Sequence, residues 1–368
     1  MNITNILRKL TETAGPSGME QEIAATITDL WRPYVDSVTT DRIGNLIAVK
    51  NGSGQAEARR LLVAAHMDEI ALMVKEIVRY PEHGAGEDEA YGFLRVTGVG
   101  GVDVRHLYGQ QVVVHGRRDL RGLVGALPVQ MLPKERHNKP YNYDELLVDV
   151  GLPLARVKEV VAVGDFVSFR QPLRKLLNRR LAGKAMDNRA SVAAVAVSLE
   201  YLQGRHHDWD VVAVATAQEE TRLLGAFTSA YAHFPDAAIA LDVTFGKGPG
   251  AKDEGKVYEL GEGPTIDFGP NVHPGLYKKL QEAAKALEMD VHPSPHTRGS
   301  GTDAFGLQIA RSGIPTGLIG IPLRYMHTMV ETVDAADVER AGRLLGEFIA
   351  RLDASFLKDI AKEMMSES

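Results

Sequence analysis

The chain has 368 residues, of which 44% are hydrophobic, 24% charged and 6% aromatic, a composition typical of a globular protein with about two domains or one elaborated α/β domain. Its 42 basic and 48 acidic residues give a net charge of −6, so we expect neither nucleic acid nor an anionic membrane surface as a partner. Cysteine is absent, which excludes disulfides and thiolate chemistry and leaves His, Asp and Glu as the possible metal ligands.

The first part of the chain predicts a helix and a strand and then changes character. Apolar spacing over residues 20–35 is typical of an amphipathic helix, and residues 44–52 predict a strand. From about Tyr80 to Arg170 the chain is rich in glycine and charge, with short alternating runs such as "YGFLRVTGVGG" and "GQQVVVHGRRD". Short strands at this spacing indicate a small β barrel or sandwich inserted into a larger domain.

Beyond residue 180, apolar strands alternate with amphipathic helices. The predicted strands are 210–217, 237–244 and 314–322, and the predicted helices are 188–202, 274–289 and 334–352. This alternation indicates an α/β fold whose sheet is covered by helices on both faces. No apolar run approaches about 20 residues and the N-terminal segment lacks a signal-peptide core, so we expect a cytoplasmic protein without a membrane span.

Ionisable side chains follow the predicted buried strands. They are His66 and Asp68 after "LLVAA", Glu219 and Glu220 after "VVAVATAQ", Asp242 after "AAIAL", His327 after "TGLIGIPLRYM", and Asp187 at the start of the helix "DNRAS". In open α/β sheets, ligands bind beyond the carboxyl ends of the strands. We therefore expect these side chains to converge on one edge of the sheet.

Bringing five carboxylates together creates an electrostatic problem. Unpaired burial costs several kcal/mol per ion, and two divalent cations would nearly balance the negative charge. With the imidazoles of His66 and His327, the set suits zinc, cobalt or manganese. Each residue also has an ordinary interpretation, since a lone histidine is more often structural, adjacent glutamates are usually solvated, and Asp187 could be a helix N-cap. Their joint occurrence favours a metal site.

The ordered motifs of the chain resemble the M42 metallo-aminopeptidases, which include the glutamyl aminopeptidases and the self-compartmentalising tetrahedral peptidases. The strings that carry the resemblance are "AHMDEI" (65–70), "GKAMDNR" (183–189), "AQEE" (217–220), "LDVT" (241–244), "SGTDAF" (300–305) and "IPLRYMHTMVE" (321–331). "AGPSGMEQEI" and "DRIGNLIAVKNG" also match, so the resemblance covers essentially the whole chain. It implies a doubly wound, mixed-sheet peptidase domain at residues 1–71 and 169–368, with a β-barrel-like dimerisation domain inserted at 72–168.

The resemblance also implies a centre with two divalent metal ions, zinc or cobalt. Asp187 would bridge the two ions. His66 and Asp242 would complete one site, and Glu220 and His327 would complete the other.

Two further residues receive roles from the resemblance. Glu219 would act as the general base, and Asp68 would orient His66. The enzyme would remove N-terminal residues from peptide substrates, and its dimers could build a dodecamer.

The chain departs from the family pattern at a few positions. After the two glutamates it has "TRLLGA", where the family commonly has Val-Gly and then an Arg before Gly-Ala. Thr221, Arg222 and Leu224 thus leave local packing and substrate preference open, and "LPVQML" in the insert lacks a Pro-His often found there. "FGKGPG" (245–250), "HTRGSG" (296–301) and Arg324 are candidate walls of the specificity pocket or solvated loops, and the remaining candidates to line the cleft are His273, His292 and His296.

Two other functions compete with the peptidase. Relatives of this family are sometimes labelled endoglucanases, and paired acids are typical of glycoside hydrolases. Glycosidase carboxylates, however, flank a bond from opposite sides about 5–9.5 Å apart and usually need no metal, whereas Glu219 and Glu220 are adjacent. A non-catalytic metal-binding assembly protein is the third interpretation, although such a protein needs no free base like Glu219.

Overall fold

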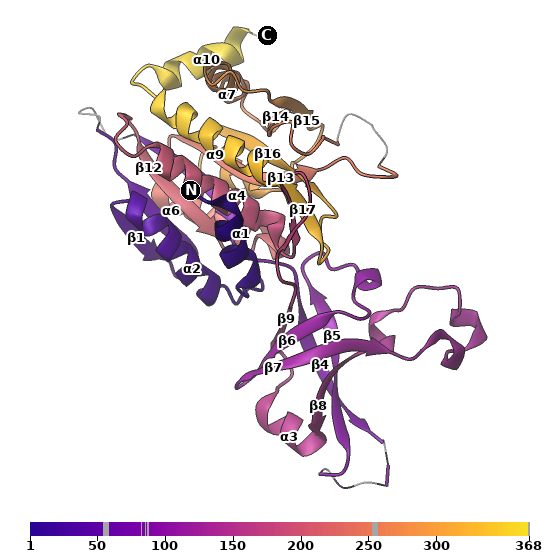
Figure 1. The fold of residues 1–368 in the computed structure, drawn as a ribbon. Helices are drawn as coiled ribbons and strands as arrows, with labels where there is room; N and C mark the ends of the chain where they lie inside the picture. The colour runs from indigo at the N-terminus through magenta and orange to yellow at the C-terminus, as the bar shows by residue number, and fades with distance from the viewer. Residues whose placement is uncertain (54–58, 82, 85, 87, 252–256, 367–368) are drawn as a thin grey trace.

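The structure, a computed structural model, describes residues 1–53, 59–81, 83–84, 86, 88–251 and 257–366. A large mixed sheet with helices on both faces forms one part of the molecule, and a closed β barrel forms the other (Figure 1). Both termini lie with the sheet, and the barrel extends away below it in this view. The predicted α/β class, with a mixed sheet and a small β barrel, is confirmed.

The large sheet has the strand order β1-β2-β12-β3-β13-β16-β17-β11-β10, with β14 and β15 attached to β16. Its strands are β1 (Ser37–Thr40), β2 (Leu46–Lys50), β3 (Arg60–His66), β10 (Arg174–Lys175), β11 (Arg180–Gly183), β12 (Asp210–Thr216), β13 (Ala237–Phe245), β14 (Thr265–Phe268), β15 (His292–Pro295), β16 (Thr316–Arg324) and β17 (Glu331–Asp334). The central strands β12, β3, β13 and β16 are parallel, whereas β1, β2, β17, β11 and β10 pair antiparallel. Parallel strands are buried on both faces, which explains their continuous apolar sequences.

Side chains of the central strands alternate between two cores. In β3, Leu61 and Val63 belong to the larger core, whereas Leu62 and Ala64 belong to the smaller one on the opposite face. The larger core includes residues of α1 (Ile3–Glu12), α2 (Gln21–Trp31), α4 (Met186–Tyr201), α7 (Pro274–Ala286), α9 (Ala335–Ala350) and α10 (Phe356–Ser366). The smaller core is closed by α6 (Leu224–His233) and α8 (Asp303–Gln308). The sheet is therefore doubly wound.

The barrel is formed by the segment between β3 and β10. Its strands, in spatial order, are β4 (Ala71–Tyr80), β5 (Tyr91–Val99), β8 (Leu146–Pro153), β7 (Asp119–Ala126), β6 (Gln111–His115) and β9 (Phe166–Phe169). Antiparallel pairing of β9 with β4 closes the barrel. Its core is filled by buried branched side chains such as Val112, Val114, Val148 and Val167, and α3 (Leu154–Val160) packs against β5.

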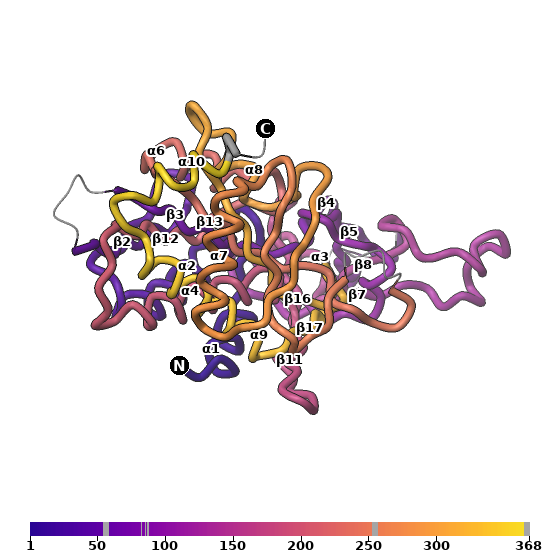
Figure 2. The backbone as a smooth tube through the Cα atoms, turned by 90° about the horizontal axis from the view of Figure 1, so that it is seen from above, coloured from indigo at the N-terminus to yellow at the C-terminus, as the bar shows by residue number. Residues whose placement is uncertain are grey.

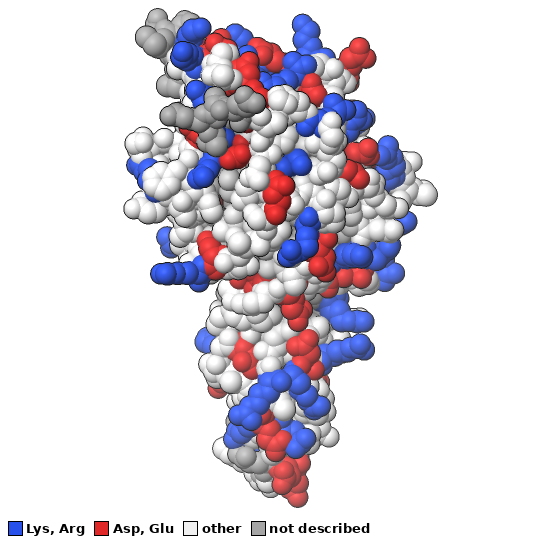
Figure 3. All heavy atoms as spheres, turned by 90° about the vertical axis from the view of Figure 1, so that its left-hand side faces the viewer, with Lys and Arg blue, Asp and Glu red and all other residues white. Residues whose placement is uncertain are grey.

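Two segments project from the body of the molecule. An arm carrying the 3-10 helices Val129–Met131 and Lys134–Arg136 extends from the barrel, and the β10–β11 hairpin projects from the sheet (Figure 2). Both expose apolar side chains, with Met131 67% and Leu177 86% exposed. Figure 3 shows basic and acidic side chains interspersed over one face of both parts. No helix in the described ranges is long and apolar enough to cross a membrane.

A buried ion pair joins the segment after β3 to the start of α4. The ammonium group of Lys184 donates to both carboxylate oxygens of Glu69, at 2.7 and 2.6 Å, and a guanidinium nitrogen of Arg189 lies 3.6 Å from one of them. The backbone N–H of Gly15 also donates to Glu69, at 3.0 Å. Burial lowers the pKa of Lys184, while Glu69 opposes that shift. The pair fixes residues 184–189 against the end of β3.

Candidate metal centre

The parallel strands deliver the predicted site residues to one edge of the sheet. His66 is the last residue of β3, and Asp242 lies near the carboxyl end of β13. The short helix α5 (Glu219–Arg222) begins with both glutamates, three residues after the end of β12 at Thr216. His327 lies in the turn between β16 and β17, with a left-handed backbone at φ 59°. The carboxyl ends of parallel strands therefore meet here as the sequence predicts.

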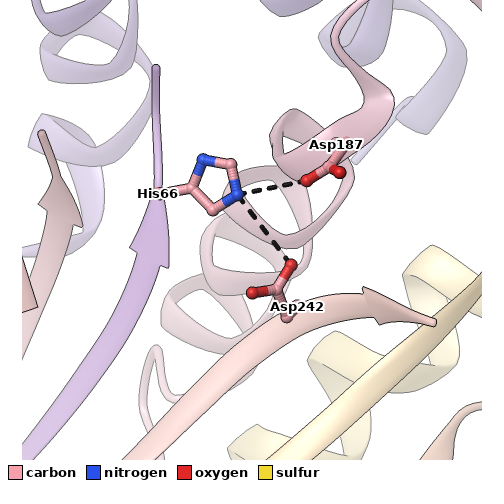
Figure 4. A group of neighbouring side chains, drawn as sticks. All are labelled: His66, Asp187 and Asp242. Carbon is pink, nitrogen blue, oxygen red and sulfur yellow. Dashed lines mark hydrogen bonds and ion pairs between the residues drawn. The ribbon is translucent and has the colours of Figure 1, made fainter. Parts of the chain in front are cut away.

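Three buried side chains form the first possible ligand group, and Figure 4 shows them converging from β3, β13 and the start of α4. His66 Nε2 lies 3.1 Å from Asp187 Oδ1 and 3.9 Å from Asp242 Oδ1. One ligand atom of each residue lies within 4.8 Å of the others, which is close enough for one cation to contact all three.

A second group shares Asp187 with the first. His327 Nε2 lies 3.3 Å from Asp187 Oδ2 and 3.5 Å from Glu220 Oε2. The two carboxylate oxygens of Asp187 therefore face different histidines, the arrangement that a bridging ligand requires. The structure brings together all five side chains predicted as ligands, and metal binding by them stays a prediction.

The backbone at the start of α4 turns Asp187 into the site. Asp187 has φ −75° and ψ 103°, outside the helical region, although it lies in the first turn of the helix. Its N–H donates to Glu331, and its side chain faces the two histidines rather than capping backbone N–H groups. The structure thus favours a ligand over an N-cap as the role of Asp187.

Crowding of ionisable groups shifts their proton affinities. Burial raises the pKa of Glu219 to about 10 and that of Glu220 to about 8, and it raises the pKa of Asp242 well above its usual value. Burial alone would lower the pKa of His66, but the surrounding carboxylates raise it well above its usual value. A hydrogen bond to the shared aspartate raises the pKa of His327 to about 9. The cluster therefore attracts positive charge, and its nitrogen and oxygen donors suit a divalent ion.

Asp68 supports the turn that carries the two glutamates. Its carboxylate accepts hydrogen bonds from the backbone N–H of Glu219 at 3.0 Å and of Glu220 at 3.1 Å. Its distance to His66 Nδ1 is longer, at 3.5 Å. The orientation of His66 by Asp68 therefore stays a prediction, because His66 Nδ1 has no hydrogen-bond partner among the described residues, whereas the two shorter contacts are ones that the sequence does not indicate.

Two supporting residues escape the sequence analysis. Glu331 is buried and accepts hydrogen bonds from the backbone N–H groups of Asp187 at 3.1 Å and His327 at 2.8 Å. The carbonyl oxygen of Gly101, in the loop after barrel strand β5, lies 3.1 Å from His327 Nδ1. A hydrogen bond from Nδ1–H to this carbonyl would leave Nε2 free to bind a metal ion. Glu331 lies only four residues after His327, whereas no sequence signal connects Gly101 with the site.

A cavity of about 820 Å³ adjoins the two ligand groups. Thr221 and Arg222 of α5 and the following Leu223 line the cavity, as do Asp267 and Ser294 from β14 and β15. Residues 296–302 complete the rim. The cavity is large enough for a peptide N-terminus, since ligand pockets typically measure about 300–1,000 Å³.

The other candidate residues divide between this cavity and structural positions. All six residues of "HTRGSG" (296–301) and Phe245 line the cavity. His296 Nε2 lies 2.6 Å from Asp267 Oδ2. His273 instead caps α7 by accepting from the N–H of Gly275. Arg324 pairs outside the cavity, with its Nε donating to the carbonyl of Lys247, and His292 packs on the ring of Tyr258.

Comparisons with known proteins agree on one family. A model described as M42 glutamyl aminopeptidase matches residues 44–344. The lysyl aminopeptidase of Pyrococcus furiosus is 35% identical over 354 residues, covering 94% of this chain and 96% of that protein. The TET aminopeptidase of Thaumarchaeota archaeon SCGC AB-539-E09 superposes with a TM-score of 0.87 at 29% identity, covering 97% of this chain and 98% of that one. The Pyrococcus horikoshii TET1 peptidase, which can assemble into a tetrahedron or a large octahedral shell, has a TM-score of 0.80 at 28% identity, covering 95% and 100%.

One similar structure carries a different name. An endoglucanase from Thermotoga maritima has a TM-score of 0.73 at 27% identity, covering 96% of this chain and 99% of that one. The same fold is therefore associated with two activity names, and the chemistry of the site has to decide between them.

Replacing Gly101 by alanine should disturb the second ligand group. A Cβ atom at this position would lie 2.5 Å from His327 Nδ1 and 2.7 Å from its Cε1, so the imidazole would have to move. We expect metal affinity at the group of Asp187, Glu220 and His327 to fall about 10–100-fold, as for other losses of contacts that orient metal ligands. Titration against a chromophoric chelator, with metal content by mass spectrometry, measures this change.

Gly125→Ala provides the matched control in the barrel. The nearest atom to a Cβ at this position, the carbonyl oxygen of Leu147, is 4.0 Å away, so we expect unchanged metal binding. Wild-type metal affinity in Gly101→Ala would show that the barrel loop does not position His327.

Proposed function

The chain belongs to the M42 glutamyl aminopeptidase family and is an exopeptidase of the aminopeptidase class, and from this premise we propose that it cleaves peptides with two divalent metal ions and a glutamate base. The observation that carries the proposal is the pair of ligand groups sharing Asp187. Structural likeness alone would leave the chemistry open, whereas this side-chain arrangement suits metal-assisted hydrolysis.

His66, Asp187 and Asp242 would hold one ion, and Glu220 and His327 would hold the other together with Asp187. When bound, the two ions, zinc or cobalt, would polarise the scissile carbonyl and lower the pKa of a water molecule. Sharing of Asp187 supports two ions rather than one, because its two oxygens face different histidines.

Glu219 is the proposed general base. It belongs to neither ligand group, yet its Oε2 lies 3.8 Å from His66 Nε2 and it lines the cavity. The bond from its N–H to Asp68 holds it in place. From there it would take a proton from water and donate it to the leaving amine of the peptide. Its neighbour Glu220 would serve as a metal ligand, so the two adjacent glutamates would have different roles, one as base and one as ligand.

The geometry favours this function over the alternatives. Glu219 and Glu220 are consecutive residues of one helical turn, and both histidines point into the acidic cluster. A glycosidase needs two carboxylates on opposite sides of a bond and has no task for these imidazoles. A binding protein would need no side chain like Glu219 beside the ligand groups. A cytoplasmic location stays a prediction from the sequence.

We also propose a homo-oligomer in which the barrel pairs two chains and dimers build a dodecamer. The related TET1 peptidase can assemble into a tetrahedron, and tetrahedral symmetry relates twelve copies. Exposed apolar side chains on the barrel and its arm support an interface there, with Leu123 56% and Leu127 53% exposed.

Light scattering tests the assembly. We expect a mass of about twelve times the 40.1 kDa of one chain. A dimer would contradict the dodecamer, and a monomer would contradict both the dodecamer and the pairing of two chains through the barrel.

Removal of metal should abolish peptidase activity, and its return should restore it. The experiment strips the protein with a chelator, resupplies zinc, cobalt or manganese, and measures hydrolysis of a panel of aminoacyl-p-nitroanilides. N-acetylated substrates should resist cleavage because an aminopeptidase requires the free amine. Carboxymethylcellulose is assayed in parallel, and metal-independent release of sugar, or no activity with any metal, would overturn the proposed function.

The substitution Glu219→Gln should remove the base while keeping the shape of the side chain. We expect the rate to fall at least about 10²–10⁴-fold, the usual contribution of general acid–base catalysis. Metal content should stay at the wild-type value, because Glu219 is outside both ligand groups. A fully loaded variant with a near-normal rate would exclude Glu219 as the base.

A further inference from the structure

Two arginines stand at a cavity that is otherwise rich in acids. Among the described residues that line the cavity, Arg222 and Arg298 are the arginines, and none is a lysine. The acidic lining residues are Asp187, Glu219, Glu220, Asp242 and Asp267. The proposed function uses four of these acids, but it assigns no role to either arginine.

Arg222 is exposed and has no ionic partner in the described part of the chain, although two carboxylates precede it closely. Glu219 and Glu220 direct their carboxylates towards His66 and His327 instead. Because these carboxylates face the histidines, the donors of Arg222 at the cavity wall stay available for a ligand.

The position of Arg222 relative to Glu219 defines which part of a substrate it would meet. α5 is a single turn, closed by donation from the N–H of Leu223 to the carbonyl of Glu219 at 3.0 Å. Residues three apart lie on the same side of a helical turn, with Cβ atoms about 5–6 Å apart. Since Glu219 would protonate the leaving amine, Arg222 would lie near the leaving group of a bound substrate.

We propose that Arg222 binds a carboxylate on the leaving-group side of the substrate. In a dipeptide, one carbon atom separates the leaving amine from the C-terminal carboxylate, and an acidic residue after the cleaved bond places a carboxylate only slightly farther away. Guanidinium groups recognise carboxylates through two parallel hydrogen bonds, and a lysine could not reproduce that geometry. The site would therefore favour short peptides with a free C-terminus or peptides with an acidic second residue.

This inference rests on the proposed function, and it concerns a position at which the chain departs from the family pattern. The test compares four peptides that share the N-terminal residue preferred in the nitroanilide panel: the dipeptide with glycine as free acid, its amide, and the amides ending in glutamate and in glutamine. The nitroanilide of the same residue has no carboxylate and reports the basal activity.

For the wild type, we expect kcat/KM to be about 10-fold or more higher for a carboxylate-bearing peptide than for its neutral counterpart, the effect of one charge-assisted hydrogen bond. In Arg222→Gln this preference should disappear, mainly through KM, while nitroanilide hydrolysis is unchanged. Arg222→Lys should retain part of the preference. The free-acid and glutamate comparisons separately identify the C-terminus or the side chain as the source of the carboxylate.

Two further variants locate the effect. Arg298→Gln alters the other arginine of the cavity, and Arg42→Gln alters an exposed arginine outside it. We expect neither to change the preference. Transfer of the effect to Arg298→Gln would overturn the assignment to Arg222.

The remaining outcomes are also decisive. Equal rates for acid and amide in an active wild type would overturn this inference and leave the peptidase intact. Equal loss on every substrate in Arg222→Gln would show a structural role instead. A wild type inactive on the nitroanilide with every metal would overturn both the inference and the function on which it rests.

Discussion

Repulsion among buried carboxylates is the constraint on which the site depends. Asp187, Glu220 and Asp242 lie together at the sheet edge, where water cannot screen them well. The fold holds them through their backbones: Asp68 and Glu331 are themselves acids, yet each accepts backbone N–H groups and so fixes the chain without adding a positive side chain. The charge of the site therefore favours the binding of cations.

The turns that present the site residues contain strained backbone conformations. Gln218, Leu223 and His327 all have left-handed φ values near 60° although none is glycine. Each such residue costs on the order of 1–3 kcal/mol, and such conformations persist only where the surroundings determine them. Two of these residues flank α5, so the turn that presents both glutamates is held by the packed strands beneath it rather than by local preference.

The sequence predicts the architecture well because buried parallel strands and amphipathic helices have different patterns of apolar residues along the chain. It also predicts which side chains meet, since His66, Asp242 and His327 all follow apolar runs whose carboxyl ends share an edge. It does not place a helix at residues 3–12, although Asn2 caps that helix and Ile3 and Leu7 are buried on one side. It cannot connect Gly101 with His327, because that contact depends on how the barrel sits against the sheet. The identity of the metal and the preferred substrate depend on binding affinities, which the spacing of residues in the sequence does not determine.

The ion pair of Glu69 and Lys184 restricts how this sequence can change over evolutionary time. Loss of Glu69 would leave the buried charges of Lys184 and Arg189 without their shared carboxylate, and breaking a buried pair in this way typically costs about 3–5 kcal/mol. Lys184 and Arg189, five residues apart, both face Glu69 on a distant segment, so the three positions are coupled. We therefore expect a viable replacement of Glu69 to need changes at the two basic positions as well.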